Sequence, residues 1–282
     1  MQEHDGKRVH RADALAIRRL VGLTSPSMDQ SSASRRLKAN GYAAGILLAL
    51  VFGCAPKSAE DAAVSQIERL GGVVNPSIED GERRGWQVML NSARSADEAL
   101  EHVGKLPRLR VLNLQESRVT DAGLRWLREA KDLEFLYLAH TRIGDQGLAH
   151  LQQLAKLKRL ELSGTQISND GLANLAGMVN LEELELSNTQ ITGEGLAHLK
   201  NLQRLHYLTL SGSKVGGAGL ENLNDLASLR ILWLMGNQVD DSDIPHFAGL
   251  MQLESLVVRG TEITDDGARR LQDALPDCTI LR

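Results

Sequence analysis

The chain has 282 residues, of which 42% are hydrophobic, so it is long and apolar enough to bury a sizeable core. Its net charge of −4 is mild, and residues 85–275 contain no block of lysine and arginine, which argues against nucleic-acid binding. With two cysteines the chain cannot build a framework of several disulfides, and a core of this size does not need one.

The first part of the chain has the pattern of an export signal. A basic segment at 35–38 precedes an apolar run at 42–53 and then Cys54. The run is shorter than the roughly 20 apolar residues that span a membrane, so the pattern predicts a secretory signal. Its end, Val51-Phe52-Gly53-Cys54, resembles a bacterial lipobox, which implies that Cys54 is lipidated and becomes the first mature residue. An uncleaved signal anchor, or cleavage near the same point without lipid, stays open as the alternative.

This signal begins unusually far from residue 1. Residues 28–54 alone form an ordinary signal peptide starting at Met28, so we predict that 1–27 are a disordered extension from a mis-assigned start codon. The segment 34–36 is similar to a twin-arginine signal but lacks the Phe-Leu pair that usually follows. Ala55 is not the aspartate that retains such lipoproteins in the inner membrane. The expected location is therefore the cell envelope, lipid-anchored, at the outer membrane if the cell has one.

Residues 55–84 are expected to form a linker and an N-terminal capping helix. The apolar spacing over 58–70 is typical of an amphipathic helix, and the glycine pair at 71–72 ends it. A short strand near 73–74 is expected to pair with residues 87–90.

Residues 85–275 are organised by a period of 24 residues, which predicts one structural unit stacked on copies of itself. Seven clear coils each begin with a leucine: Leu109, Leu133, Leu157, Leu181, Leu205, Leu229 and Leu253. An eighth, degenerate coil begins at Gly85 and places four residues on core positions: Val88, Leu90, Leu100 and Val103. Residues 276–282 are predicted to be a C-terminal cap with a closing strand, in which Cys278 is a buried apolar residue.

Each coil, numbered from its leading residue, has apolar side chains at positions 1, 4, 6, 11, 16 and 19. The spacing of positions 4 and 6 is that of a strand, and positions 16 and 19 share a helical face, so each coil is a strand, a turn and a return helix. Position 9 holds short polar residues that can bond the backbone, and position 12 holds helix N-caps. Coil six departs, because Asp243 replaces a glycine and Pro245 falls in the helix, which predicts a late start at Asp243 or a 3₁₀ turn.

The pattern L-x-x-L-x-L-x-x-T-x-I-x-D-x-G-L-x-x-L resembles the leucine-rich repeat family. Its Gly-Leu pair at the helix start, as in Gly147-Leu148, is similar to bacterial surface repeats and F-box-associated repeats. The resemblance implies an α/β fold: a right-handed solenoid shaped like a horseshoe, with a parallel sheet on the concave face and helices on the convex face.

No catalytic motif is found in the chain. It lacks a Gly-rich phosphate loop, a metalloprotease helix, a nucleophile elbow and a CxxC pair, so we expect neither an enzyme nor a cofactor. Acidic residues after position 12 fit the first turn of a helix better than metal ligation. His150, His198 and His246 recur at position 18 of alternate coils, roughly 10 Å or more apart, which is too far for one shared metal ion.

Positions 3 and 5 of each coil are expected to point out of the sheet on the concave face. They place Phe135 and Tyr137 on coil two, and Tyr207, Ile231 and Trp233 on coils five and six. Between these aromatic patches lie four charged residues: Arg159, Glu161, Glu183 and Glu185. Arg159 and Glu183 are predicted to pair, whereas Glu161 and Glu185 lie side by side and need a nearby cation.

These observations predict a non-catalytic, envelope-anchored module that binds a protein, or a glycan, on the concave face. The expected contact residues are Phe135, Tyr137, Glu161, Glu185, Tyr207, Ile231 and Trp233, because exposed Tyr and Trp often anchor interfaces. Replacing both Tyr207 and Trp233 by alanine is expected to abolish capture with little loss of thermal stability. The alternative is a structural surface lipoprotein that self-associates through the ends or flanks of the solenoid.

Overall fold

The computed structural model describes residues 58–282, all within the compact unit Pro56–Arg282. The predictions on residues 1–57, including the signal peptide and the lipidation of Cys54, lie outside the described residues. Throughout 58–282, each helix is too short or too polar to span a bilayer.

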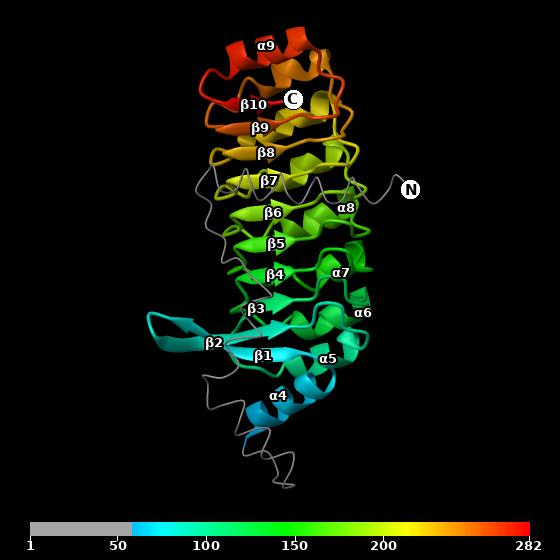
Figure 1. Ribbon diagram of the computed structural model, residues 1–282, viewed down its shortest axis with the longest axis vertical. Helices are drawn as coiled ribbons and strands as arrows, with labels where there is room; N and C mark the ends of the chain where they lie inside the picture. The colour runs from blue at the N-terminus through cyan, green and yellow to red at the C-terminus, as the bar shows by residue number, and fades with distance from the viewer. Residues whose placement is uncertain (1–57) are drawn as a thin grey trace. The chain divides into compact units, whose positions relative to one another are not determined.

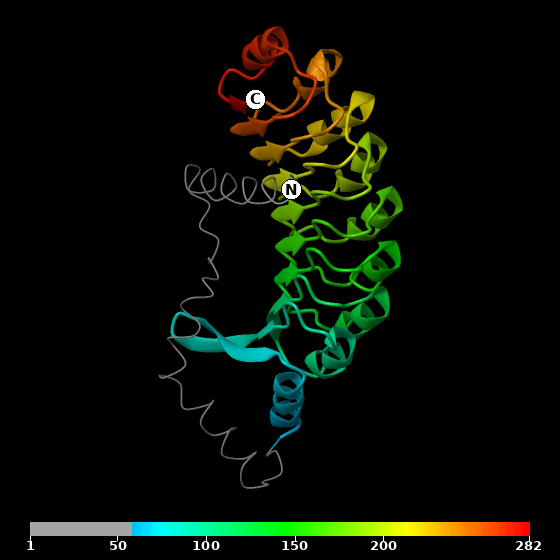
Figure 2. The ribbon, with the colours of Figure 1, turned by 45° about the vertical axis from the view of Figure 1, so that its right-hand side comes forward.

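The described chain forms an α/β solenoid around one ten-stranded sheet, as predicted. The strands follow each other in chain order from β1 to β10, antiparallel for β1–β2 and parallel for the rest. Figure 1 shows them stacked as rungs, and Figure 2 shows the stack curving with the strands on its inner side and the return segments on its outer side. The strands are β1 Val73–Glu79, β2 Glu82–Met89, β3 Leu109–Asn113, β4 Phe135–Tyr137, β5 Arg159–Glu161, β6 Glu183–Glu185, β7 Tyr207–Thr209, β8 Ile231–Trp233, β9 Ser255–Val257 and β10 Thr279–Leu281.

The register between strands equals one repeat. Leu136 lies opposite Leu160, Leu160 opposite Leu184, and Leu184 opposite Leu208, so the position 4 leucines form one continuous row. These leucines have no exposed surface. A coil alone would leave both flanks of its leucines in water, so stacking is what closes the core.

The return segments are shorter and tighter than the predicted helices. The return segments of coils one to three begin with a single α-helical turn, and those of coils four to six consist only of 3₁₀ helix. A 3₁₀ helix rises about 2.0 Å per residue against about 1.5 Å for an α-helix, so it crosses the outer face with fewer residues. The segments are α6 Asp121–Leu124, η1 Arg125–Leu127, α7 Asp145–Ala149, α8 Asn169–Leu172, η2 Ala173–Leu175, η3 Gly193–Leu199, η4 Gly217–Asp225 and η5 Asp241–Phe247, with one regular helix, α9 Asp265–Ala274, in the last coil.

A carboxylate or amide at position 13 connects consecutive coils. Asp145 accepts hydrogen bonds from the backbone N–H and the hydroxyl of Ser168 in the next coil, at 2.9 and 2.6 Å. The glycine at position 15 of that next coil, Gly171, leaves the space in which this carboxylate lies. Asp97, Asp121, Asn169 and Asp241 make the same backbone contact. The glycine of the Gly-Leu pair is therefore required by the neighbouring coil.

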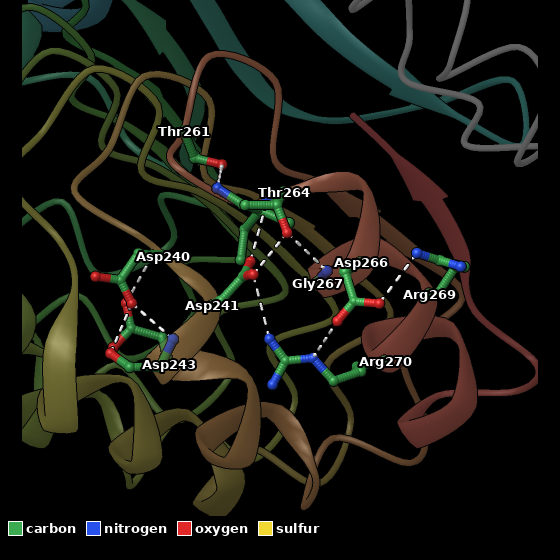
Figure 3. A network of polar contacts seen from close by, with 11 residues as sticks. Asp240, Asp241, Asp243, Thr261, Thr264, Asp266, Gly267, Arg269 and Arg270 are labelled. Atoms are coloured by element: carbon green, nitrogen blue, oxygen red, sulfur yellow. Dashed lines mark hydrogen bonds and ion pairs between the residues drawn. The ribbon is translucent and has the colours of Figure 1, made fainter.

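Coil six exchanges the two partners of this contact. The preceding coil has Gly217 at position 13, and Asp243 occupies position 15, where it is buried. The Asp243 carboxylate instead accepts the backbone N–H of Asp240 at 3.1 Å, in a capping box within its own coil. Figure 3 shows this cap beside the ordinary contact of the following joint, in which Asp241 accepts from Thr264. The segment is 3₁₀ helix around Pro245, which confirms that alternative of the prediction.

Two turn positions close each strand. The threonines at position 9 bond the carbonyl at position 6 of their own coil, as Thr141 does to Leu138 at 2.6 Å, and Ser213 and Asn237 bond the same carbonyl of the preceding coil, which confirms their predicted bonding to backbone. Position 8 has positive φ in all seven clear coils: Glu116, His140, Gly164, Asn188, Gly212, Gly236 and Gly260. This left-handed conformation favours glycine, and the variety of residues there concealed it in the sequence.

The N-terminal end carries a helix and a hairpin. Helix α4, Ala59–Arg69, begins at the cap Ser58, which confirms the helix predicted over 58–70. It packs on α5, Ala96–Val103. Strand β1 pairs with β2 over 73–79, which confirms the expected pairing and extends it into a hairpin that projects from the stack (Figure 2). The backbone N–H of Trp86 points away from β1, toward Arg108 at the start of β3. In this antiparallel pair the backbone nitrogen of its partner, Pro76, therefore points to the outer edge of β1. The missing donor of Pro76 protects this edge from pairing with another strand.

At the other end, the closing strand β10 pairs with β9. Cys278 is buried there, as predicted, and burial raises its pKa to about 11. Its thiol therefore stays protonated and unreactive at neutral pH.

Candidate functional site: the concave face of the sheet

Two rows of side chains run along the inner face of the sheet. The core leucines at positions 4 and 6 point one way, so positions 3 and 5 point the other way. From coil one to coil seven, position 3 reads Val111, Phe135, Arg159, Glu183, Tyr207, Ile231 and Ser255. Position 5 reads Asn113, Tyr137, Glu161, Glu185, Thr209, Trp233 and Val257. All seven predicted contact residues therefore lie on one surface, which we call the concave face.

Arg159 organises the acidic centre of the concave face. Its guanidinium lies 2.9 Å from Glu183 and 2.5 Å from Glu185, and its side chain is only 8% exposed. The pairing with Glu183 confirms the prediction. The contact with Glu185 shows that the cation beside the adjacent carboxylates belongs to the chain itself. Glu161 accepts a hydrogen bond of 2.7 Å from the amide of Gln115.

Coil two supplies the half-buried aromatic side of this centre. The guanidinium of Arg159 lies 5.4 Å from the centre of the Tyr137 ring, within the range of a cation–π contact. Burial raises the pKa of Tyr137 above its ordinary value, so its hydroxyl stays protonated at neutral pH. Phe135, two residues earlier on the same strand, is also half-buried. Both rings keep enough surface to contact a ligand.

Coils five and six are different, because their aromatic side chains are covered. Tyr207, Ile231 and Trp233 are 1%, 2% and 6% exposed. The rings of Tyr207 and Trp233 pack edge to face, with centroids 5.4 Å apart, and flanking rungs cover their sides. The expectation that both could become alanine with little loss of stability is therefore wrong, since each substitution would open a cavity.

Charged side chains at position 2 of neighbouring coils form an ion ladder that borders the start of the strands. Glu134 bridges Arg110 at 2.6 Å and Lys158 at 2.9 Å on the rungs to either side. Burial opposes the charged form of Glu134, but the hydrogen bonds from Arg110 and Lys158 outweigh it and hold its pKa below the ordinary value. The ladder is adequately explained as a structural element.

The histidines at position 18 lie on the outer face, with His198 exposed and the other two half-buried. Within residues 58–282, no group of three or more His, Cys, Asp or Glu side chains could hold a metal ion.

Comparison with known proteins identifies the repeat. The profile of a family described as Leucine Rich repeat matches residues 153–176, 178–199 and 250–271. No curated protein sequence matches the chain. Among solved structures, internalin C2 from Listeria monocytogenes is similar with a TM-score of 0.55 and 25% identity, over 71% of this chain and 81% of that chain. A plant peptide hormone receptor, RGFR1 in complex with RGF2, is similar with a TM-score of 0.47 and 19% identity, over 64% of this chain and 29% of that chain.

The profile matches all lie within the repeat region 85–275, each running from the end of one coil into the next, and the internalin similarity extends over most of the described residues. The chain therefore contains leucine-rich repeats, and its fold is an α/β leucine-rich-repeat solenoid.

Proposed function

We propose that this protein is a non-catalytic binding module that holds a protein ligand on the concave face at coils two to four. The observation that carries the proposal is the acidic centre itself. Two carboxylates, Glu183 and Glu185, pair with the guanidinium of Arg159, and a third, Glu161, lies directly beside Glu185 on the adjacent strand, so three carboxylates gather at one place on the concave face. Solenoids of this kind present such faces to ligands, and their repeats carry no reaction centre by default.

The chemistry of the centre favours a basic segment of the ligand. A lysine or arginine side chain placed against Glu161 and Glu185 would be attracted by this group of carboxylates, while its aliphatic stem packs on the rings of Phe135 and Tyr137. Tyr207, Ile231 and Trp233 continue the same rows, and we assign them the role of a rigid floor beside the contact. A glycan ligand remains the alternative that the sequence left open.

The contact can be tested by site-specific cross-linking. A photoreactive phenylalanine analogue at position 135 should form an adduct with a distinct protein of the envelope extract, whereas the same group at the exposed outer-face position Ala149 should not. Identical adducts from both positions would remove the case for the concave face. An adduct that carries carbohydrate without peptide would identify the glycan alternative.

The purified ligand then tests the acidic centre. Glu161→Lys should weaken binding at least about tenfold and reduce its dependence on salt, since a charge pair across the interface becomes a repulsion. Glu194→Lys, at an exposed position on η3, is the matched control and should bind as the unchanged protein does. Equal binding by both variants would contradict the proposal.

We further propose that the module is anchored in the cell envelope by lipid on Cys54, on the strength of the sequence pattern at 51–54. Cells fed a clickable palmitate should label the protein, and Cys54→Ser should abolish the label. Labelling that persists in the serine variant would reject lipidation at this residue.

Self-association is the second candidate, and one observation favours it. Val179 and Met251 both occupy position 23, on the same flank of the stack, and are 49% and 58% exposed. If this flank joins copies of the protein, light scattering should detect an oligomer that the double substitution to lysine dissociates. A monomer at high concentration would eliminate this candidate.

A further inference from the structure

A pocket lies at the strand-start edge of the first coils, away from the concave face. It has a volume of about 200 Å³ and is lined by Glu79, Arg84, Arg108, Arg110, Asp132, Glu134 and Lys156. The lining thus combines the end of β1, the hairpin strand β2, the starts of coils one and two, and the residues that directly precede coils one to three.

The acidic side chains of this pocket are already paired. Arg110 lies 2.8 Å from Glu79 and 2.6 Å from Glu134, and Lys156 lies 2.7 Å from Asp132. Arg110 is shared by two carboxylates, and Glu134 also pairs with Lys158 at 2.9 Å, so three cations face three carboxylates and supply no net attraction for a further cation.

Two arginines of the pocket have no such partner. Arg108 makes no ion pair with any residue of 58–282. Arg84 reaches Glu82 only at 3.6 Å, and both side chains of that pair are largely exposed, at 48% and 74%. An exposed pair of this length contributes little. The uncompensated charge of the pocket is thus positive and belongs to Arg84 and Arg108.

The backbone holds Arg108 in an unusual conformation. Its φ is +52°, in the left-handed region, whereas the corresponding residues of the next two coils, Asp132 and Lys156, do not share it. The carbonyl of Arg108 accepts the N–H of Trp86 at 3.0 Å, and the absence of a side chain at Gly85 allows this close approach. A strained residue held by its surroundings in this way is often part of a functional site.

We propose that this pocket binds an oxyanion, the carboxylate or phosphate group of a ligand, between the guanidinium groups of Arg84 and Arg108. Arginine suits this task because its planar fork donates two parallel hydrogen bonds to such a group. The site is independent of the concave face and of its proposed ligand, so either can fail without the other.

The test follows the side-chain Nε–H resonances of arginine in the ¹⁵N-labelled full chain at constant ionic strength. Inorganic phosphate and acetate are titrated separately. Saturable shifts of the Arg84 and Arg108 signals with phosphate alone assign a phosphate site, and saturable shifts with acetate assign a carboxylate site. Arg142, which is exposed and makes no ion pair within the described residues, is the internal control. Linear drift shared by all three arginines would overturn the proposal.

Substitution provides the second measurement. Arg108→Gln should weaken binding of the saturating anion by about tenfold, the loss expected for roughly one charge-assisted hydrogen bond. Arg142→Gln should leave it unchanged. Equal affinity in the two variants would also overturn the proposal.

Discussion

Replacing Gly171 by alanine tests the joint between coils most directly. Its φ is in the ordinary range, so a β-carbon there is opposed mainly by the Asp145 carboxylate of the preceding coil, with a milder contact to the Ile167 side chain at 3.1 Å. The added methyl should displace that carboxylate from the N–H and hydroxyl of Ser168. Two hydrogen bonds to a charged, half-buried acceptor are worth about 2 kcal/mol together. Alanine regains about 0.5 kcal/mol in a helical turn, so the net loss should be about 1.5 kcal/mol.

A double-mutant cycle gives this prediction its sharpest form. Asp145→Ala alone should lose about 2 kcal/mol, because it removes the same hydrogen bonds. Once the carboxylate is gone, adding Gly171→Ala should cause no further loss, which corresponds to a coupling of about −1.5 kcal/mol. Urea unfolding followed by circular dichroism measures all four proteins, provided that the slope with denaturant is unchanged.

The control for this cycle is Gly177→Ala. Gly177 is exposed, and a β-carbon there would make only an ordinary contact with the carbonyl of Gln152. The stability of this variant should be equal to or slightly above that of the unchanged protein. If Gly171→Ala is as mild as the control, or if its effect is the same with and without Asp145, the proposed joint does not exist.

Three further predictions concern single positions. Gly212→Ala places a side chain at a φ of +68° and should lower the free energy of unfolding by about 1–2 kcal/mol. Tyr207→Ala should lose about 3 kcal/mol because the ring is buried, whereas Tyr137→Phe should change thermal stability little. The hydroxyl and then the amide of Thr264 hold the pKa of Asp241 below its ordinary value of 3.8. That carboxylate stabilises the fold above pH 3.8 and the contribution disappears as pH falls through the lowered pKa, so Asp241→Asn should flatten the acid limb of a stability–pH curve.

The architecture could be predicted from the sequence because the spacing of the leucines reflects it directly. Side chains such as Leu136 and Leu160 must be buried, and a 24-residue interval between them permits only a stack of coils with that register. Pairing of Arg159 with Glu183 also followed, since residues one repeat apart lie side by side on adjacent strands.

Features that depend on contacts between coils were harder to predict. Several return segments are 3₁₀ helix because a fixed number of residues must cross the outer face, and the length of that path sets the rise per residue. The repeat period does not report the length of the path. Tyr207 and Trp233 were assigned to the correct face, but their edge-to-face contact and their burial are tertiary features that the repeat period does not report. Pairing of Arg159 with Glu185, two positions along and one rung across, needed a side-chain conformation that spacing alone does not give.

The exchange of Gly217 and Asp243 limits the order in which coils can be recombined. A coil with glycine at position 15 can follow any other coil, because the glycine leaves room for either a carboxylate or a backbone segment of the preceding coil. Coil six, with Asp243, can follow only a coil that has glycine at position 13, and coils four and five, with Gly193 and Gly217, meet this condition. Moving coil six behind coil two would bring Asp243 against Asp145, two acidic side chains in a space sized for one. Insertion or grafting of coils in this solenoid is therefore directional, even though every coil has the same length.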